Sequence, residues 1–262
     1  MLKFKNLGSG STGNASVIES QCGLQTTRIL IDCGLGLKEL ERRLIQAELE
    51  LRDLDALFIT HEHADHVGHT RRVAGTLGIP VWMSQGTWLA CNGLDWGLDS
   101  SQINIARDTQ LINIGALQIT PFTVPHDARE PLQVKLTDGS VSMGLLTDLG
   151  HVSSHVLTQL QGCNALLMET NHDTQMLRNS GYPQFLKDRI SGPLGHLSND
   201  SACELARKLN HKDLGHVVAA HLSERNNSPE IVLECLSKAL GRSQDEVCVA
   251  SPDTGSAWVT VN

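Results

Sequence analysis

The sequence predicts an α/β fold in which two β-sheets lie between helices. Short apolar runs typical of buried strands gather in both halves of the 262-residue chain, and segments with helical periodicity flank each group. No stretch has the composition of a linker, a repeat or a low-complexity tract. We therefore expect residues 1–262 to form one domain with a sizeable hydrophobic core.

The N-terminal part of the chain is predicted to form strands and then a helix. The first three predicted strands cover residues 2–7, 15–20 and 27–32. The glycine-rich segment Gly8–Asn14 separates the first two and is either a plain hairpin loop or a loop that approaches a phosphate group. Residues 36–48 repeat apolar side chains at helical spacing. The predicted buried face of this helix consists of Leu37, Leu40, Leu44 and Ile45.

The remaining elements alternate between strands and helices. Further strands are predicted at residues 55–60, 80–83, 164–169, 216–220, 246–250 and 257–261, and in several short runs within 101–147. Helices are predicted near 66–78 and 84–94. Two later helices have clear starts. Ser198 supplies a cap before residues 202–209, and the pair Ser228-Pro229 supplies one before residues 231–240.

The segment His61–His66 is the strongest functional signal in the chain. Its sequence HEHADH places three imidazoles and the carboxylate of Asp65 directly behind the apolar run 55–60. Side chains alternate along an extended chain, so His61 and His63 should point the same way, and the turn that follows brings Asp65 and His66 towards the same point. Imidazole nitrogen and carboxylate oxygen are ligands for zinc and similar ions. A metal site is therefore a better interpretation than a polar surface turn.

Three further residues of a metal-binding type lie where a predicted apolar strand ends. They are His126, Asp148 and His221. A single histidine at a strand end is more often a hydrogen-bonded structural group, and one aspartate can simply belong to a turn. Their joint occurrence downstream of HEHADH makes all three candidate metal ligands. The histidines without this pattern are interpreted as structural or surface residues: His69, His151, His155, His172, His211 and His216.

Charge and cysteine content narrow the possible functions. A formal charge of −8 argues against nonspecific electrostatic binding to nucleic acid or to an anionic membrane. Bound cations would nevertheless reverse the sign of the charge locally. The seven cysteines include no CxxC pair and predict reduced thiols in a cytoplasmic protein, with Cys33, Cys163 and Cys248 in the core. We expect no signal peptide, no membrane span and no membrane partner.

At this point the sequence resembles the metallo-β-lactamase superfamily over nearly its whole length. Asp32 corresponds to the first motif of that family, HEHADH to the second in its HxHxDH form, and His126, Asp148 and His221 to the last three. The resemblance implies a four-layer αββα sandwich and two divalent metal ions, for which Zn, Mn or Fe would be suitable.

The resemblance also implies which residues hold the metals. One ion would be bound by His61, His63 and His126. The other would be bound by Asp65, His66 and His221. Asp148 would bridge the two ions, and Asp32 would orient ligands through hydrogen bonds.

Within the superfamily the chain looks most like the small YycJ/WalJ-like proteins, which are phosphodiesterases of the exonuclease type. The segments that carry this similarity are Leu7–Asn14, His126–Ala128, Gly195–Asp200 and His221–Asn227. Glyoxalase II usually has a Gly-His-Thr type third motif, whereas this chain has Pro125-His126-Asp127. The bridging Asp148 is not part of the true β-lactamase pattern.

This resemblance implies a dinuclear hydrolase that cleaves phosphodiester bonds with a metal-bound hydroxide. Asp65 would orient the hydroxide, and Glu169 and His196 would deliver a proton to the leaving oxygen. The simpler interpretations are a strand-end acid for Glu169 and a turn residue for His196. The substrate would be DNA, RNA or a small phosphodiester, and the oligomeric state stays open.

Two other functions remain as alternatives. A thioesterase of the glyoxalase II type or a lactone hydrolase would use the same metals without needing Glu169 or His196. A non-catalytic, metal-stabilised module is the third hypothesis. The basic groups Arg71-Arg72, Lys187–Arg189 and Arg225 either contact an anionic chain or are merely solvated.

Overall fold

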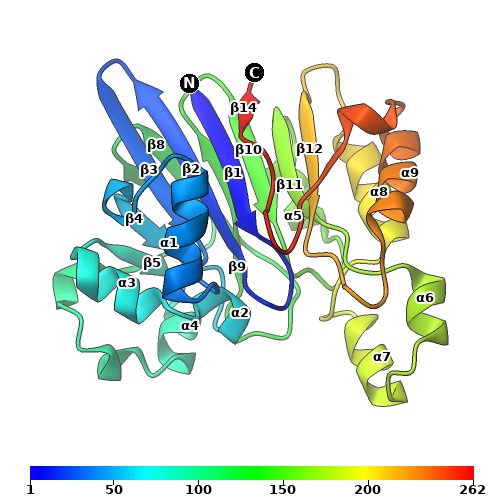
Figure 1. The fold of residues 1–262 in the computed structure, drawn as a ribbon, viewed down its shortest axis with the longest axis horizontal. Coiled ribbons are helices and arrows are strands. Elements are labelled where there is room, and N and C mark those ends of the chain that lie inside the picture. The colour runs from blue at the N-terminus through cyan, green and yellow to red at the C-terminus, as the bar shows by residue number, and fades with distance from the viewer.

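The strands of the protein form two mixed seven-stranded sheets (Figure 1). The structure is a computed structural model that describes all of residues 1–262. The first sheet has the order β14 (Val259–Val261), β1 (Leu2–Gly8), β2 (Ala15–Cys22), β3 (Gln25–Ile31), β4 (Ala56–Phe58), β5 (Val81–Met83) and β6 (Ile103–Ile105). The second has the order β13 (Cys248–Val249), β12 (His216–Ala220), β11 (Ala165–Glu169), β10 (Ser142–Leu146), β9 (Leu132–Thr137), β8 (Leu117–Thr123) and β7 (Ile112–Ile114).

The helices fall into two groups, one for each half of the chain. The first group is α1 (Leu37–Gln46), α2 (Ala64–Val67), α3 (Thr70–Leu77) and α4 (Gln85–Ala90). The second is α5 (Ser154–Leu160), α6 (Thr174–Asn179), α7 (Gln184–Ile190), α8 (Asn199–Leu209) and α9 (Pro229–Leu240). In Figure 1, α1 and α3 lie on one side of the molecule and α8 and α9 on the other, while α6 and α7 project from its lower edge.

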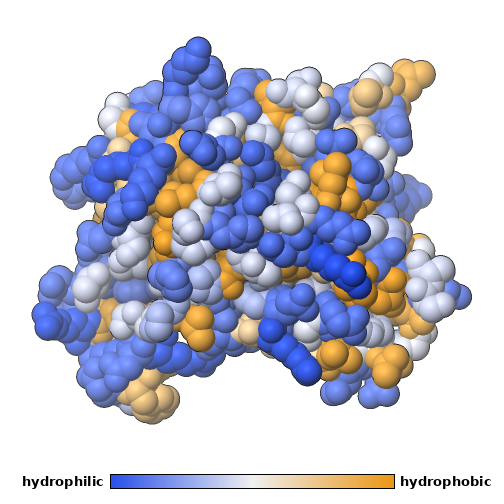
Figure 2. Space-filling view, turned by 180° about the vertical axis from the view of Figure 1, so that it is seen from behind, coloured by the Kyte–Doolittle hydropathy of each residue, from blue (hydrophilic) through white to orange (hydrophobic).

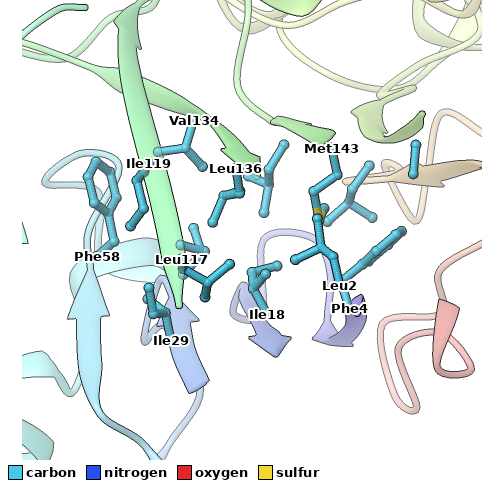
Figure 3. Close-up of a cluster of buried hydrophobic side chains, with 14 of the residues drawn as sticks. Leu2, Phe4, Ile18, Ile29, Phe58, Leu117, Ile119, Val134, Leu136 and Met143 are labelled. Atoms are coloured by element: carbon cyan, nitrogen blue, oxygen red, sulfur yellow. The ribbon is translucent and has the colours of Figure 1, made fainter. Parts of the chain in front are cut away.

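Three separate hydrophobic clusters define the layers. One lies between the two sheets and includes Phe4 and Phe58 from the first sheet and Leu117 and Leu136 from the second (Figure 3). A second fills the space between the first sheet and helices α1 and α3, and a third fills the space between the second sheet and helices α5, α8 and α9. The predicted four-layer αββα sandwich is therefore confirmed.

The direction of the strands decides where the functional site can form. Strands β10, β11 and β12 are mutually parallel, and so are β3, β4 and β5 in the other sheet. The carboxyl ends of parallel strands meet at one edge of a sheet, which is where ligands bind in open α/β sheets. Residues that follow these strands are thus brought together from both sheets.

Several predicted elements differ from the observed ones. The helix expected near 66–78 begins at Ala64 and breaks at Gly68, because the backbone N–H of His69 donates to the carbonyl oxygen of Cys33 and not to a helical partner. Glycine is needed at position 68, because a Cβ there would lie 2.7 Å from the same carbonyl oxygen. Ile45 was predicted on the buried face of α1 but is 67% exposed. The caps at Ser198 and Ser228 are confirmed, since their side chains accept from the backbone N–H groups of Ser201 and Ile231.

The prediction that all cysteines are reduced is wrong. Cys203 of α8 and Cys235 of α9 form a disulfide. The two helices pack against each other and bring together residues that are 32 positions apart, so no local motif signals the pair. Cys33 and Cys163 are buried as predicted, whereas Cys248 is exposed.

None of the helices combines the length and the apolar composition needed to cross a bilayer. On the face shown in Figure 2, hydrophilic residues predominate and hydrophobic residues occur in small, separated groups.

Candidate metal centre

The candidate ligands gather at the carboxyl ends of strands from both sheets. Asp32 directly follows β3, His61 and its neighbours follow β4, and His126 follows β8. Asp148 lies two residues beyond β10, Glu169 ends β11, and His221 directly follows β12. These residues follow or end six different strands, and His196 lies in the loop before α8, so the structure brings together every residue that the sequence singled out for the site.

Three histidines form the first potential ligand group. The Nε2 atom of His61 lies 3.0 Å from Nδ1 of His63, which lies 3.3 Å from Nε2 of His126. His61 and His126 are buried, and the ligand atoms of all three lie within 4.8 Å of one another. Such a cluster of imidazole nitrogens is suited to a divalent transition metal.

A second group consists of Asp65, His66 and His221, whose ligand atoms also lie within 4.8 Å of one another. Asp148 lies beside this group. One of its oxygens is 2.7 Å from Nε2 of His66 and the other is 2.9 Å from Nδ1 of His221. Since Asp148 also forms a group with His61 and His66, it connects the two halves of the cluster.

Two buried polar atoms in this cluster lack a hydrogen-bond partner. They are Oδ2 of Asp148 and Nδ1 of His221, whose close contacts do not have hydrogen-bond geometry. An unsatisfied buried polar atom costs about 1–3 kcal/mol, and an uncompensated buried charge costs more. A cation bound among these atoms would remove that cost, so the donor set fits divalent metal binding.

The electrostatics of the cluster favour a bound cation for a second reason. Burial alone would raise the pKa of the Asp148 carboxyl, but His221 and His66 hold it well below its usual range. Burial also lowers the pKa of His61 and of His126, so these two rings are neutral and their nitrogens can bind a metal.

His66 differs from the other histidines because two carboxylates face it. Burial opposes a charge on this ring, but Asp148 and Asp32 raise its pKa well above the ordinary value. Nδ1 of His66 lies 2.7 Å from Oδ2 of Asp32, and Thr60 donates to Asp32 through both its backbone N–H and its hydroxyl. Asp32 therefore contacts the ring of His66 directly, and its role in orienting a metal ligand remains a prediction.

Three residues of the site have left-handed backbone conformations. The φ angles are 61° for Asp32, 56° for Asp148 and 57° for His221. Each residue lies at the turn out of a buried strand, where this conformation directs its side chain towards the cluster. Such strain costs about 1–3 kcal/mol per residue and is typical of functional sites.

Glu169 and His196 form a hydrogen-bonded pair beside the cluster. Oε1 of the fully buried Glu169 lies 2.7 Å from Nδ1 of His196, and Oε2 accepts from the backbone N–H groups of Leu149 and Leu197. Burial opposes a charge on His196, but Glu169 and Asp148 raise its pKa to about 9. His196 lines the cavity described below, and a pKa in this range favours the protonated ring at neutral pH.

Distance alone would also allow Glu169 and His196 to bind a metal together with Asp148 and His221. However, both oxygens of Glu169 already accept hydrogen bonds, and Nδ1 of His196 faces Glu169. The pair is therefore better suited to holding a proton than to binding an ion.

Sequence reasoning missed two residues that support the cluster. Asn14, at the end of the glycine-rich loop, places its Nδ2 atom 3.2 Å from Oδ2 of Asp65 and 3.0 Å from Nε2 of His66. Gly34 leaves room for the HEHADH segment, because a Cβ there would lie 1.7 Å from the carbonyl oxygen of Asp65. The only sequence signal was that both lie near predicted site segments.

A cavity of about 620 Å³ opens over the metal cluster. His63, Asp65, Asp148, His196 and His221 line its floor. None of the six histidines interpreted as structural or surface residues belongs to a potential ligand group or lines the cavity.

Both the sequence and the fold are similar to those of known proteins. The sequence model described as "Beta-lactamase superfamily domain" matches residues 27–221. Exodeoxyribonuclease YycJ of Bacillus anthracis is 33% identical over 239 residues, which cover 91% of this chain and 89% of that protein. Exodeoxyribonuclease WalJ of Streptococcus pneumoniae is 32% identical, over 97% of this chain and 96% of that protein. The crystal structure of YhfI from Bacillus subtilis, a metallo-β-lactamase fold protein, superposes with a TM-score of 0.73 at 15% identity and covers 98% of both chains.

Proposed function

This chain belongs to the β-lactamase superfamily, and from that membership we propose that it is a metal-dependent phosphodiesterase of the exonuclease type that acts on nucleic acid. The relatives that share 32–33% of its sequence over most of its length are exodeoxyribonucleases. The observation that carries the proposal is the Glu169–His196 pair beside the ligand cluster, because a phosphodiester leaving group needs a proton whereas a thiolate does not.

We further propose that the cluster holds two divalent ions. His61, His63 and His126 would bind one, Asp65, His66 and His221 would bind the other, and Asp148 would contact both. When bound, such ions supply a nucleophile at neutral pH and neutralise the charge of the phosphate. Zn, Mn and Fe all accept this mixture of imidazole and carboxylate ligands.

The other residues of the site would keep this arrangement rigid. Asp32 holds His66 through Nδ1, and the carbonyl oxygen of Gly195 lies 3.1 Å from Nδ1 of His126. A hydrogen bond at one ring nitrogen fixes the tautomer and leaves the other nitrogen free to bind metal. Because the ligands come from both sheets, we also propose that residues 1–262 act as a single domain.

His196 would deliver the proton to the leaving oxygen. Its Nδ1 atom is held by Glu169, which leaves Nε2 as the donor towards the cavity. Glu169 would act as a positioning residue, since it contacts His196 and two backbone amides. Asp65, on the cavity floor beside Asn14, would orient the attacking water.

A parallel assay on one purified sample tests the proposed function. The substrates are single- and double-stranded DNA, RNA, bis(p-nitrophenyl) phosphate and a glutathione thioester. We expect metal-dependent release of nucleotides from nucleic acid and hydrolysis of the small phosphodiester, with little or no thioester cleavage. Efficient thioester hydrolysis without phosphodiester hydrolysis would contradict the proposal and favour a glyoxalase II type of activity.

A further inference from the structure

Besides the candidate ligands, two further segments line the cavity. One comprises Tyr182 and the residues Leu186 and Ile190 of α7. The other is the loop Leu222–Arg225, which follows the candidate ligand His221. Hydrolysis of a small ester at the candidate ligands would not require either segment, so these segments indicate what else the site binds.

Tyr182 and Arg225 both line this cavity and lie beside each other. Tyr182 is the only tyrosine of the chain, which has only 3% aromatic residues. The guanidinium carbon of Arg225 lies 6.0 Å from the centroid of the Tyr182 ring, at the outer limit of a cation–π contact. Tyr182 is half-buried and Arg225 is exposed, so the contact is weak and a bound ligand can replace it.

Arg225 supplies the free positive charge of the cavity. The other arginine in the lining, Arg189, is paired with Asp127 at 2.7 Å, whereas Arg225 forms no ion pair with a carboxylate. No lysine lines the cavity. Arg225 can therefore pair with a phosphate of a bound strand, and its flat guanidinium can also stack against a base.

The loop that carries Arg225 is held in place by buried amides. Nδ2 of Asn171 donates to the carbonyl oxygen of His221, and the backbone N–H of Ser223 donates to the carbonyl oxygen of Asn171. Just beyond Arg225, the carbonyl oxygen of Asn226 accepts from Asp173. The loop therefore links the metal cluster to Arg225 through fixed backbone, which reduces the entropy lost when a ligand binds.

The size of the cavity limits the ligand. Its volume of about 620 Å³ lies within the range of about 300–1,000 Å³ that is typical of sites for one drug-sized molecule. A terminal nucleotide fits such a space, but a stretch of duplex does not. A base can reach the Tyr182 ring only after it leaves the helical stack.

We propose that Tyr182 and Arg225 form a stacking subsite for the terminal nucleobase of a single-stranded or frayed nucleic-acid end. This proposal rests on the proposed nuclease function. Stacking on an aromatic face tolerates every base, so the subsite gives preference for an unpaired end without preference for sequence. Leu186 and Ile190 provide apolar surface beside the base.

The test compares Tyr182→Ala with Tyr182→Phe on a single-stranded oligodeoxynucleotide and on bis(p-nitrophenyl) phosphate. Base–aromatic stacking predicts that Tyr182→Ala lowers kcat/KM on the strand by about 5- to 150-fold, while Tyr182→Phe keeps the wild-type value. The loss on the small ester should be much smaller than the loss on the strand, and an unchanged metal content shows that the fold is intact. Phe185→Ala is the matched control, because Phe185 is an aromatic residue only three positions further along, in α7, but is 74% exposed and does not line the cavity.

Oligonucleotides with an abasic residue at the 5′ or 3′ end identify the contact. The wild type should cleave one of these abasic strands more slowly than the intact strand. Tyr182→Ala should cleave that abasic strand no more slowly than the wild type does, because the stacking partner is already gone. Unchanged cleavage of the intact strand by Tyr182→Ala, or an equal loss on the small ester, would overturn the stacking subsite. Failure of the wild type to cleave any phosphodiester would instead overturn the proposed function.

Discussion

Replacing Asp148 by alanine is expected to abolish phosphodiesterase activity and to weaken metal binding by more than about 10²-fold. Changes in groups that merely orient ligands already cost about 10- to 100-fold in affinity or activity, and Asp148 would contact both ions directly. Without this carboxylate two cations would lie close together with less compensating charge. Metal content after dialysis and kcat/KM on DNA measure the two effects.

Asp108→Ala is the control for this experiment. Asp108 also contacts a histidine, His155, at 2.8 Å, but it lies outside the metal cluster. It should keep wild-type metal content and activity. If Asp148→Ala retained two metals and normal turnover, the role proposed for Asp148 would be wrong.

The second large effect is expected from His196→Ala. Positioned acid catalysis contributes about 10²–10⁴-fold, so the variant should lose that much kcat on DNA, whose leaving oxygen needs a proton. It should lose much less on bis(p-nitrophenyl) phosphate, whose leaving group departs unprotonated. Since His196 is not among the proposed ligands, metal content should stay unchanged.

Two companion variants sharpen this experiment. Glu169→Gln should show the same contrast between substrates, because Glu169 holds Nδ1 of His196 at 2.7 Å. His155→Ala removes a half-exposed histidine outside the site and should have no effect. An equal loss on both substrates would mean that His196 binds phosphate and does not donate a proton.

The sequence predicted the layers of the fold because its strands are short apolar runs with clear ends. Capping residues such as Ser198 and Ser228 also marked helix starts directly. The break at Gly68 was not predictable, because the backbone N–H of His69 donates to the carbonyl oxygen of Cys33, a residue far back in the chain. The Cys203–Cys235 disulfide was missed for the same reason, since only the packing of α8 on α9 brings the two residues together.

The candidate site was more predictable than its surroundings. HEHADH, His126, Asp148 and His221 stand at strand ends, and parallel strands bring such ends to one edge. Their convergence is observed, and their roles as metal ligands remain predictions. Asn14 and Arg225 lie in segments that the sequence singled out, but their contacts were not predictable, because these contacts depend on how loops pack against this edge.

Metal titration of the chelated protein tests the central hypothesis most directly. Bound metal and the rate of nucleotide release from DNA are measured in the same samples as Mn²⁺ or Zn²⁺ is added back. We expect a saturating stoichiometry of two ions per chain, with activity that reaches its maximum only as the second equivalent binds. Full activity with one bound ion, or with none, would contradict a two-metal phosphodiesterase.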